Sequence, residues 1–122
     1  MSAGIAIARV YDQISDKDGA RLLVDGIWPR GVAKTDLTSH DWIKEIAPSD
    51  PLRSWFDHDP DKWGEFRNRY LHELANKPDA VERCLKWCRK GPVTLLFSAR
   101  DRDHNQAVVL RDYLNQRLKK RG

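Results

Sequence analysis

The residues best suited to chemistry in this sequence lie in two short polar clusters. The first, residues 52–60, combines an arginine, two aromatic rings, a histidine and two carboxylates. The second, residues 98–105, combines two arginines, two carboxylates, a histidine and an asparagine. Arginine binds phosphate or carboxylate through two parallel hydrogen bonds, and a histidine beside a carboxylate can act as an acid or a base. The candidate catalytic residues are His58, Asp101 and His104, and no nucleophile stands out.

Both clusters also have a simpler explanation in helix capping. Asp59 directly precedes a proline, and an Asp–Pro pair is typical of the first turn of a helix. Asp103 can cap the final helix in the same way, which leaves the neighbouring arginines as solvated side chains. Capping does not explain Arg53, Asp57 or His58, so the first cluster keeps its functional interpretation.

A third segment, Trp28–Gly31, interrupts the chain directly after a predicted strand. If the strands are parallel, this segment lies at the same edge of the sheet as residues 98–104. Arg30 would then face Arg100 and His104 across a shared cleft, and Asp25 would orient one of these cations. The candidate ligand-binding residues are Arg21, Trp28, Arg30, Arg53, Ser98, Arg100 and Asn105.

Apolar periodicity and helix-boundary signals predict the elements that must position these residues. Strands are predicted at residues 5–11, 21–25 and 92–97, and helices at 51–56, 60–76, 78–90 and from Asp103 or His104 onward, while residues 41–46 fit either a short strand or one helical turn. This order predicts a small single-domain α/β sandwich with a three- to four-stranded, largely parallel sheet and about four helices. Ligands of such sheets bind where strands end and helices begin.

The length of 122 residues predicts one domain spanning residues 1–122, with a frayed basic tail at 119–122. The longest apolar runs are too short to cross a bilayer, and residues 1–10 do not resemble a secretory signal, so we expect a cytoplasmic protein without a membrane partner. Cys84 and Cys88 lie four apart on the apolar face of a predicted helix. We interpret them as core residues and predict no metal and no cofactor.

Five tryptophans are an unusual number for this length. Trp63 lies on an amphipathic helix face, while Trp28 and Trp55 flank the polar segments around Arg30 and His58. We expect Trp28 and Trp55 to wall a cleft rather than to form an open stacking surface.

Charge is distributed unevenly along the chain. Residues 1–61 hold 7 Lys and Arg against 11 Asp and Glu, whereas residues 62–122 hold 15 against 7. The basic half leaves a nucleic-acid-binding module as an alternative function, although no known nucleic-acid-binding motif supports it. A protein-interaction module without a ligand is the second alternative. The main hypothesis is a cleft for an anionic small molecule, nucleotide-like or bearing a phosphate or carboxylate, in a protein that could be a hydrolase or a transferase.

The sequence also resembles the YeaO-like branch of a family of domains of unknown function, DUF488. The resemblance covers about residues 5–118 and is carried by several unusual clusters in the right order. These are Gly19–Asp25, Trp28–Gly31, Ala47–Ser49, Trp55–Pro60, Gly91–Leu96, Ala99–Asp101 and His104–Asn105. It implies a small cytoplasmic prokaryotic α/β protein and does not imply a substrate.

Two departures from the resembling sequences concern the expected site. Position 26 is glycine, where similar sequences usually carry a basic residue, so a cleft here has one cation fewer. The broader family often has cysteine after the last strand and a Cys-His-Arg set at the start of the last helix. This chain has Phe97 and then Asn105, Gln106 and Ala107, so cysteine chemistry does not transfer to it.

Overall fold

The computed structural model describes residues 4–12, 19–32 and 41–121. The strands are β1 (Ile5–Arg9), β2 (Ala20–Leu23), β3 (Asp41–Trp42) and β4 (Val93–Phe97), and the helices are α1 (Asp50–Phe56), α2 (Trp63–Ala75), α3 (Pro78–Lys90) and α4 (Gln106–Arg121). Two short 3-10 helices, Lys44–Ile46 and Pro60–Lys62, precede α1 and α2. The ambiguous residues 41–46 therefore contain both predicted possibilities, a short strand followed by one helical turn.

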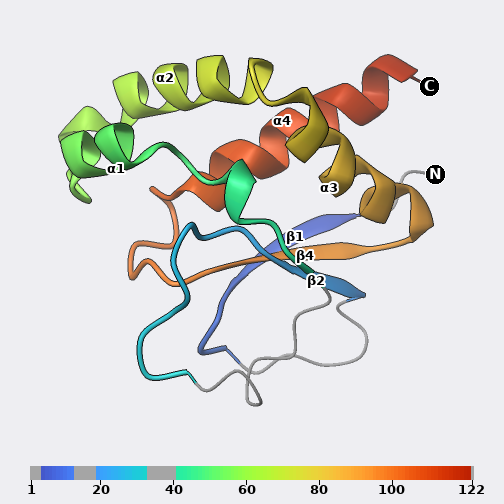
Figure 1. The fold of residues 1–122 in the computed structure, drawn as a ribbon, viewed down its shortest axis with the longest axis horizontal. Coiled ribbons are helices and arrows are strands. Elements are labelled where there is room, and N and C mark those ends of the chain that lie inside the picture. Colours follow the sequence, from blue (N-terminus) through green and yellow to red (C-terminus); the bar gives the residue numbers. More distant parts are fainter. Residues whose placement is uncertain (1–3, 13–18, 33–40, 122) are drawn as a thin grey trace.

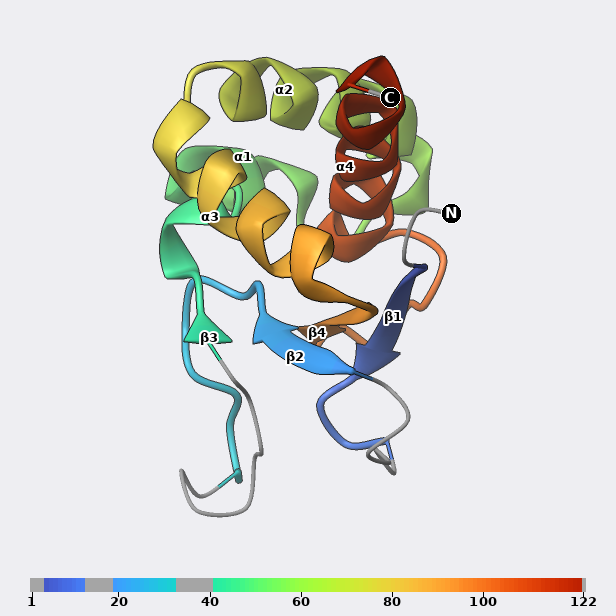
Figure 2. The ribbon, with the colours of Figure 1, turned by 90° about the vertical axis from the view of Figure 1, so that its right-hand side faces the viewer.

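The four strands form one parallel sheet in the order β1-β4-β2-β3 (Figures 1 and 2). Every residue of the central strand β4 is buried, as its unbroken apolar run predicts. The prediction of a small α/β domain with a largely parallel sheet is confirmed. Because the strands are parallel, the segments that follow β2 and β4 leave the sheet at the same edge.

The helices pack together on one face of the sheet (Figure 2). Alternate residues of β4, including Leu95 and Phe97, project into the main core beneath them. Helix α2 contributes the predicted stripe of Phe66, Tyr70 and Leu74. The buried Tyr70 hydroxyl donates a 2.7 Å hydrogen bond to the Ile46 carbonyl, which ties α2 to the turn before α1.

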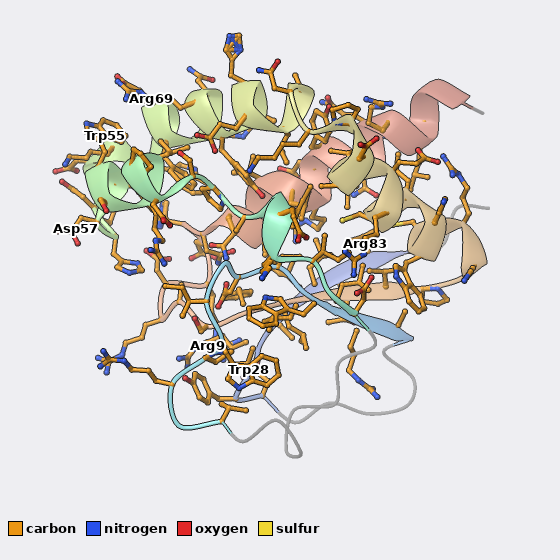
Figure 3. All side chains as sticks on the ribbon, in the orientation of Figure 1. Arg9, Trp28, Trp55, Asp57, Arg69 and Arg83 are labelled. Atoms are coloured by element: carbon orange, nitrogen blue, oxygen red, sulfur yellow. The ribbon has the colours of Figure 1, made fainter. Side chains whose placement is uncertain are left out.

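The opposite face of the sheet carries a second, smaller apolar cluster. Its buried members are Val10, Leu23 and Leu96, and Ala8, Trp28, Val32 and Trp42 pack against them. The rings of Trp28 and Trp42 meet edge to face with centroids 5.4 Å apart. The indole N–H of Trp28 donates to the Val32 carbonyl, and that of Trp42 donates to the Asp25 carbonyl. Figure 3 shows Trp28 on the side of the sheet away from the helices.

Three helix starts differ from the sequence prediction, including that of α2, which begins at Trp63 after the 3-10 helix Pro60–Lys62 rather than at residue 60. Helix α1 is capped by Ser49, whose hydroxyl accepts from the Leu52 N–H, and Asp50 lies in its first turn. Helix α4 is present as predicted, and it begins at Gln106, slightly later than the expected start near Asp103 or His104. The reason is that Asp101 accepts the backbone N–H groups of Asp103 and His104 and folds this stretch into a polar turn. At the other end, α4 continues to Arg121 through most of the expected tail.

Candidate functional site

A cavity of about 590 Å³ opens where the segments after β2 and β4 leave the sheet. Its walls come from the turn at residues 25–27, from residues 47–58 around α1, from Phe66 of α2 and from residues 98–106. Cavities of 300–1,000 Å³ are typical of small-molecule sites. The location is the one predicted for ligands of a parallel α/β sheet.

The two polar clusters of the sequence converge on this cavity. Seven of the ten candidate residues line it: Arg53, His58, Ser98, Arg100, Asp101, His104 and Asn105. The clusters are far apart in sequence, and the fold brings residues 47–58 and residues 98–106 to the walls of one cavity. A shared cavity is the minimum requirement for side chains that are to touch one ligand.

Arg21, Trp28 and Arg30 are not among the lining residues. Arg21 is buried in β2 and alternates with Leu22, so it projects to the face opposite the main core. Trp28 packs in the second apolar cluster. Arg30 is exposed, and its carbonyl accepts a hydrogen bond from the Tyr11 hydroxyl. The structure thus does not bring Arg30 to the cavity beside Arg100 and His104.

A buried carboxylate, for which the sequence suggested only an orienting role, forms part of the cavity wall. Asp25 is 8% exposed. Its Oδ2 accepts from the backbone N–H and the hydroxyl of Ser98 at 3.0 and 2.5 Å, and its Oδ1 accepts from the side-chain amide of Gln106. Burial raises the pKa of Asp25, although these donors and the nearby Arg53 favour its ionised form. A buried carboxyl with a perturbed pKa in a cavity marks a candidate ligand group.

Sequence signals for Asp25 and Gln106 were available but weak. Asp25 lies two residues after β2, at the ligand-binding edge of the sheet, and Gln106 is the first residue of α4. Neither residue type is unusual at its position. Their importance comes from their contact with each other, across 81 positions of sequence.

The predicted pair of Asp101 and His104 is present. The Nδ1 of His104 lies 2.9 Å from Oδ2 of Asp101. The backbone N–H of Asp103 and the hydrogen bonds from His104 hold the pKa of Asp101 below its usual value. The imidazole also meets the Trp63 ring edge to face, with centroids 5.2 Å apart. Two contacts on different sides therefore orient the His104 ring at the cavity wall.

Asn105 caps α4 and turns the start of this helix toward the cavity. Its side-chain oxygen accepts from the Val108 N–H, and its side-chain amide donates to the Asp101 carbonyl. The residue is 2% exposed, so its role is mainly to hold the turn and the helix together. The first turn of a helix as long as α4 carries a partial positive charge that favours an anion.

Two arginines outside the cavity anchor the segment that follows β4. The guanidinium of Arg9, at the end of β1, donates to the carbonyls of Ala99 and Ser98 at 2.9 and 3.3 Å. Arg102 forms a bidentate pair with Asp12 and lowers the pKa of that carboxyl to about 2. These contacts hold in place the loop that presents Ser98 and Arg100.

The exposed rim of the cavity carries the cations. Arg53 is half exposed and contacts the solvent-exposed Asp50 at 3.2 Å, a kind of pair that contributes at most about 1 kcal/mol. Arg100 is exposed and forms no ion pair within the described ranges. His58 follows Asp57, and both have left-handed backbones with φ of 55° and 46°. Asp and His tolerate this region better than most residues, and strain of this kind clusters at functional sites.

The remaining aromatic and sulfur side chains are structural. Lys62 and Arg69 lie over the Trp55 ring. Figure 3 shows Trp55 and Arg69 on the outer side of α1 and α2. Trp55 is therefore held by cations outside the cavity rather than forming its wall. Cys84 and Cys88 are buried free thiols, and burial raises their pKa values to about 12 and about 11. Their interpretation as core residues is confirmed.

Within residues 4–12, 19–32 and 41–121, no three His, Cys, Asp or Glu side chains come together as a metal ligand set. No helix in the same ranges has the length and apolar character needed to cross a membrane.

Comparisons with known proteins extend over nearly the whole chain. The model of a family described as "Inactive DUF488-N3 subclade" matches residues 4–122. The uncharacterised protein YeaO of Escherichia coli is 44% identical over 110 residues, which are 90% of this chain and 96% of YeaO. Uncharacterised proteins of Mycobacterium bovis and Mycobacterium tuberculosis are each 39% identical over 113 residues, covering 93% of this chain and 95% of theirs. No solved structure matches the chain.

Proposed function

Since this chain belongs to the DUF488 branch described as inactive, we propose that it binds a small anionic molecule in the cavity and leaves it chemically unchanged. The observation that carries the proposal is the convergence of Arg53 and Arg100 with the start of α4 on one cavity. Arginine recognises phosphate and carboxylate groups bidentately, and a helix start adds backbone N–H groups. Arg100 has no carboxylate partner in the described part of the chain, so its charge is available to a ligand.

Binding without turnover fits the side chains better than hydrolysis or group transfer. In the broader family that the sequence resembles, cysteine often follows the last strand, whereas this chain has the buried Phe97 at the end of β4 and Ser98 after it. Asn105 and Gln106 stand where that family often has the Cys-His-Arg set, and their side chains hold α4 and Asp25. The Ser98 hydroxyl donates to Asp25 and is committed there. His104 remains as a group that can hydrogen-bond to the ligand.

The two alternative functions have less support. Several arginines that would serve a nucleic acid are already paired with carboxylates, including Arg83 with Asp41 and Arg89 with Glu82. An interaction module needs a sizeable exposed apolar patch. The large exposed hydrophobic residues in the described ranges are Tyr11 and Ile27, and Ile27 itself lines the cavity.

The test is thermal denaturation of the whole chain with inorganic phosphate, ribose 5-phosphate and nucleoside monophosphates. A ligand at one hundred times its Kd stabilises the fold by about 2.7 kcal/mol. We expect the Arg53→Gln, Arg100→Gln double variant to lose this stabilisation. Arg117→Gln removes an arginine of α4 outside the cavity and serves as the matched control.

Two results would refute the proposal. One is that none of these anions shifts the transition. The other is that the double variant and Arg117→Gln respond to them alike. Chromatography of the bound molecule after incubation tests the second half of the proposal, because conversion to a product would show that the chain is an enzyme.

A further inference from the structure

The cavity is divided by polarity into an inner part and a rim. Asp25, Phe56 and Phe66 lie in the inner part and are 8%, 5% and 2% exposed. Arg53 and Arg100 are solvent-exposed at the rim. The apolar lining consists of Ile27, Ala47, Pro48, Phe56, Phe66 and Ala99. An inorganic anion would leave this apolar surface unused, whereas a ligand with a flat apolar body and one anionic end would match both parts.

The inner carboxylate has one hydrogen-bonding position left. A carboxylate offers about four acceptor positions, two on each oxygen. Both positions of the Asp25 Oδ2 are taken by Ser98, and one position of Oδ1 is taken by Gln106. No other donor in the described ranges reaches Oδ1. A molecule in the cavity can therefore donate one N–H or O–H to Asp25.

We infer that the ligand is a nucleoside monophosphate that enters base first, with an N–H of the base donating to Asp25 and the phosphate held by Arg53 and Arg100. This inference rests on the proposed function, because it names the ligand of the same cavity. A base is flat and carries N–H donors, and a volume of about 590 Å³ suits a nucleotide. The opposite orientation would bring a phosphate dianion against the Asp25 carboxylate, and buried like charges repel strongly.

Isothermal titration of the whole chain tests the inference directly. AMP, GMP, CMP and UMP are compared with ribose 5-phosphate, which keeps the phosphate and lacks the base. We expect at least one of the four nucleotides to bind at least about tenfold more tightly than ribose 5-phosphate. If that nucleotide is AMP, purine riboside 5′-monophosphate is the matched probe, because it differs only by the amino donor and should lose the advantage.

Two variants change the cavity wall at Asp25 and at the next residue, and both keep the rim arginines Arg53 and Arg100. Asp25→Asn keeps the size of the side chain, and its amide can replace the free acceptor by an N–H donor that repels the N–H of the base. Gly26 is an exposed residue of the cavity wall, and Gly26→Leu places an apolar side chain at that wall. A Cβ at Gly26 would lie 3.4 Å from the Ala47 Cβ, an ordinary contact, so the substitution is tolerated. We expect each variant to weaken nucleotide binding at least about tenfold and to leave ribose 5-phosphate binding unchanged. Asp112→Asn, on α4 outside the cavity, is the control for charge.

The outcomes separate this inference from the proposed function. Equal affinity for ribose 5-phosphate and all four nucleotides would overturn the inference and leave anion binding standing. A nucleotide advantage that survives both Asp25→Asn and Gly26→Leu would also overturn it, because the base would then lie elsewhere. If ribose 5-phosphate and the nucleotides all fail to bind, the proposed function itself fails.

Discussion

Replacement of Asp25 by alanine should destabilise the fold, whereas replacement by asparagine should leave its stability at neutral pH nearly unchanged or higher. Asp25→Ala leaves the half-buried Ser98 N–H without its acceptor, and an unsatisfied buried donor costs about 1–3 kcal/mol. Unfolding entropy is about 2.1 cal/mol/K per residue, or about 0.26 kcal/mol/K for 122 residues. A loss of about 2 kcal/mol therefore lowers the Tm by about 8 °C.

Asp25→Asn should retain the hydrogen bonds and remove the cost of burying a charge. The asparagine oxygen can accept from Ser98, and its amide can donate to Gln106 after the glutamine amide rotates. Because burial raises the pKa of Asp25, the stability that this group contributes is fully present below pH 3.8 and is lost as pH rises through its folded pKa. The Tm of Asp25→Asn relative to the native chain should therefore increase between pH 3.5 and pH 7.5.

Circular dichroism melts of the native chain and both variants at these two pH values provide the measurement. At pH 7.5 we expect Asp25→Asn to melt within about 4 °C of the native chain or above it, since the change is worth less than about 1 kcal/mol in hydrogen bonds. The reasoning is refuted if Asp25→Asn melts as low as Asp25→Ala at pH 7.5. It is refuted equally if the Tm difference between Asp25→Asn and the native chain falls as the pH rises.

Three further predictions concern contacts outside the cavity. Tyr70→Phe removes the donor to the Ile46 carbonyl and should cost about 1–3 kcal/mol in urea unfolding, whereas an unchanged midpoint would show that water replaces the hydroxyl. The ion pair with Arg102 lowers the pKa of Asp12 to about 2, so the stability that the pair contributes should be present above pH 3.8 and lost as pH falls toward 2. In Asp12→Asn the urea midpoint should therefore depend less on pH over this range. A midpoint with the same pH dependence as that of the native chain would contradict the pairing. Cys84 and Cys88, with pKa values raised to about 12 and about 11 by burial, should resist a thiol reagent at pH 8 until the chain unfolds, and rapid labelling of the folded chain would contradict their burial.

Local signals in the sequence were enough to predict most of the elements. The spacing of Phe66, Tyr70 and Leu74 marks one face of α2, and the apolar run of β4 marks the central strand. The Asp59 side chain caps the turn before α2 as its Asp–Pro pair predicts. Helix α4 starts slightly later than predicted because Asp101 accepts the backbone N–H groups of Asp103 and His104 and holds these residues in a turn. Asn105 then caps the helix by accepting the Val108 N–H.

The candidate site was predicted only in part, because the sequence does not show toward which face of the sheet each loop turns. The first polar cluster lies on α1 and the turn after it. The second polar cluster follows β4 at the ligand-binding edge, where parallel strands bring the segments after them together. That rule does not say to which face of the sheet a loop turns. The chain after β2 passes Asp25 at the cavity and then turns Trp28 to the second apolar cluster, which carries Arg30 away from the site.

The sequence by itself determined the elements, the α/β class and the two polar clusters, because periodicity, capping and composition act between residues close in the chain. Only the tertiary structure decided that Asp25 forms a buried wall of the cavity and that Trp28 and Arg30 do not line it. The burial of Asp25 is tolerated because Ser98 and Gln106, 73 and 81 positions away, supply its donors. No local pattern encodes such a contact, since it exists only when the ends of β2 and β4 and the start of α4 are packed together.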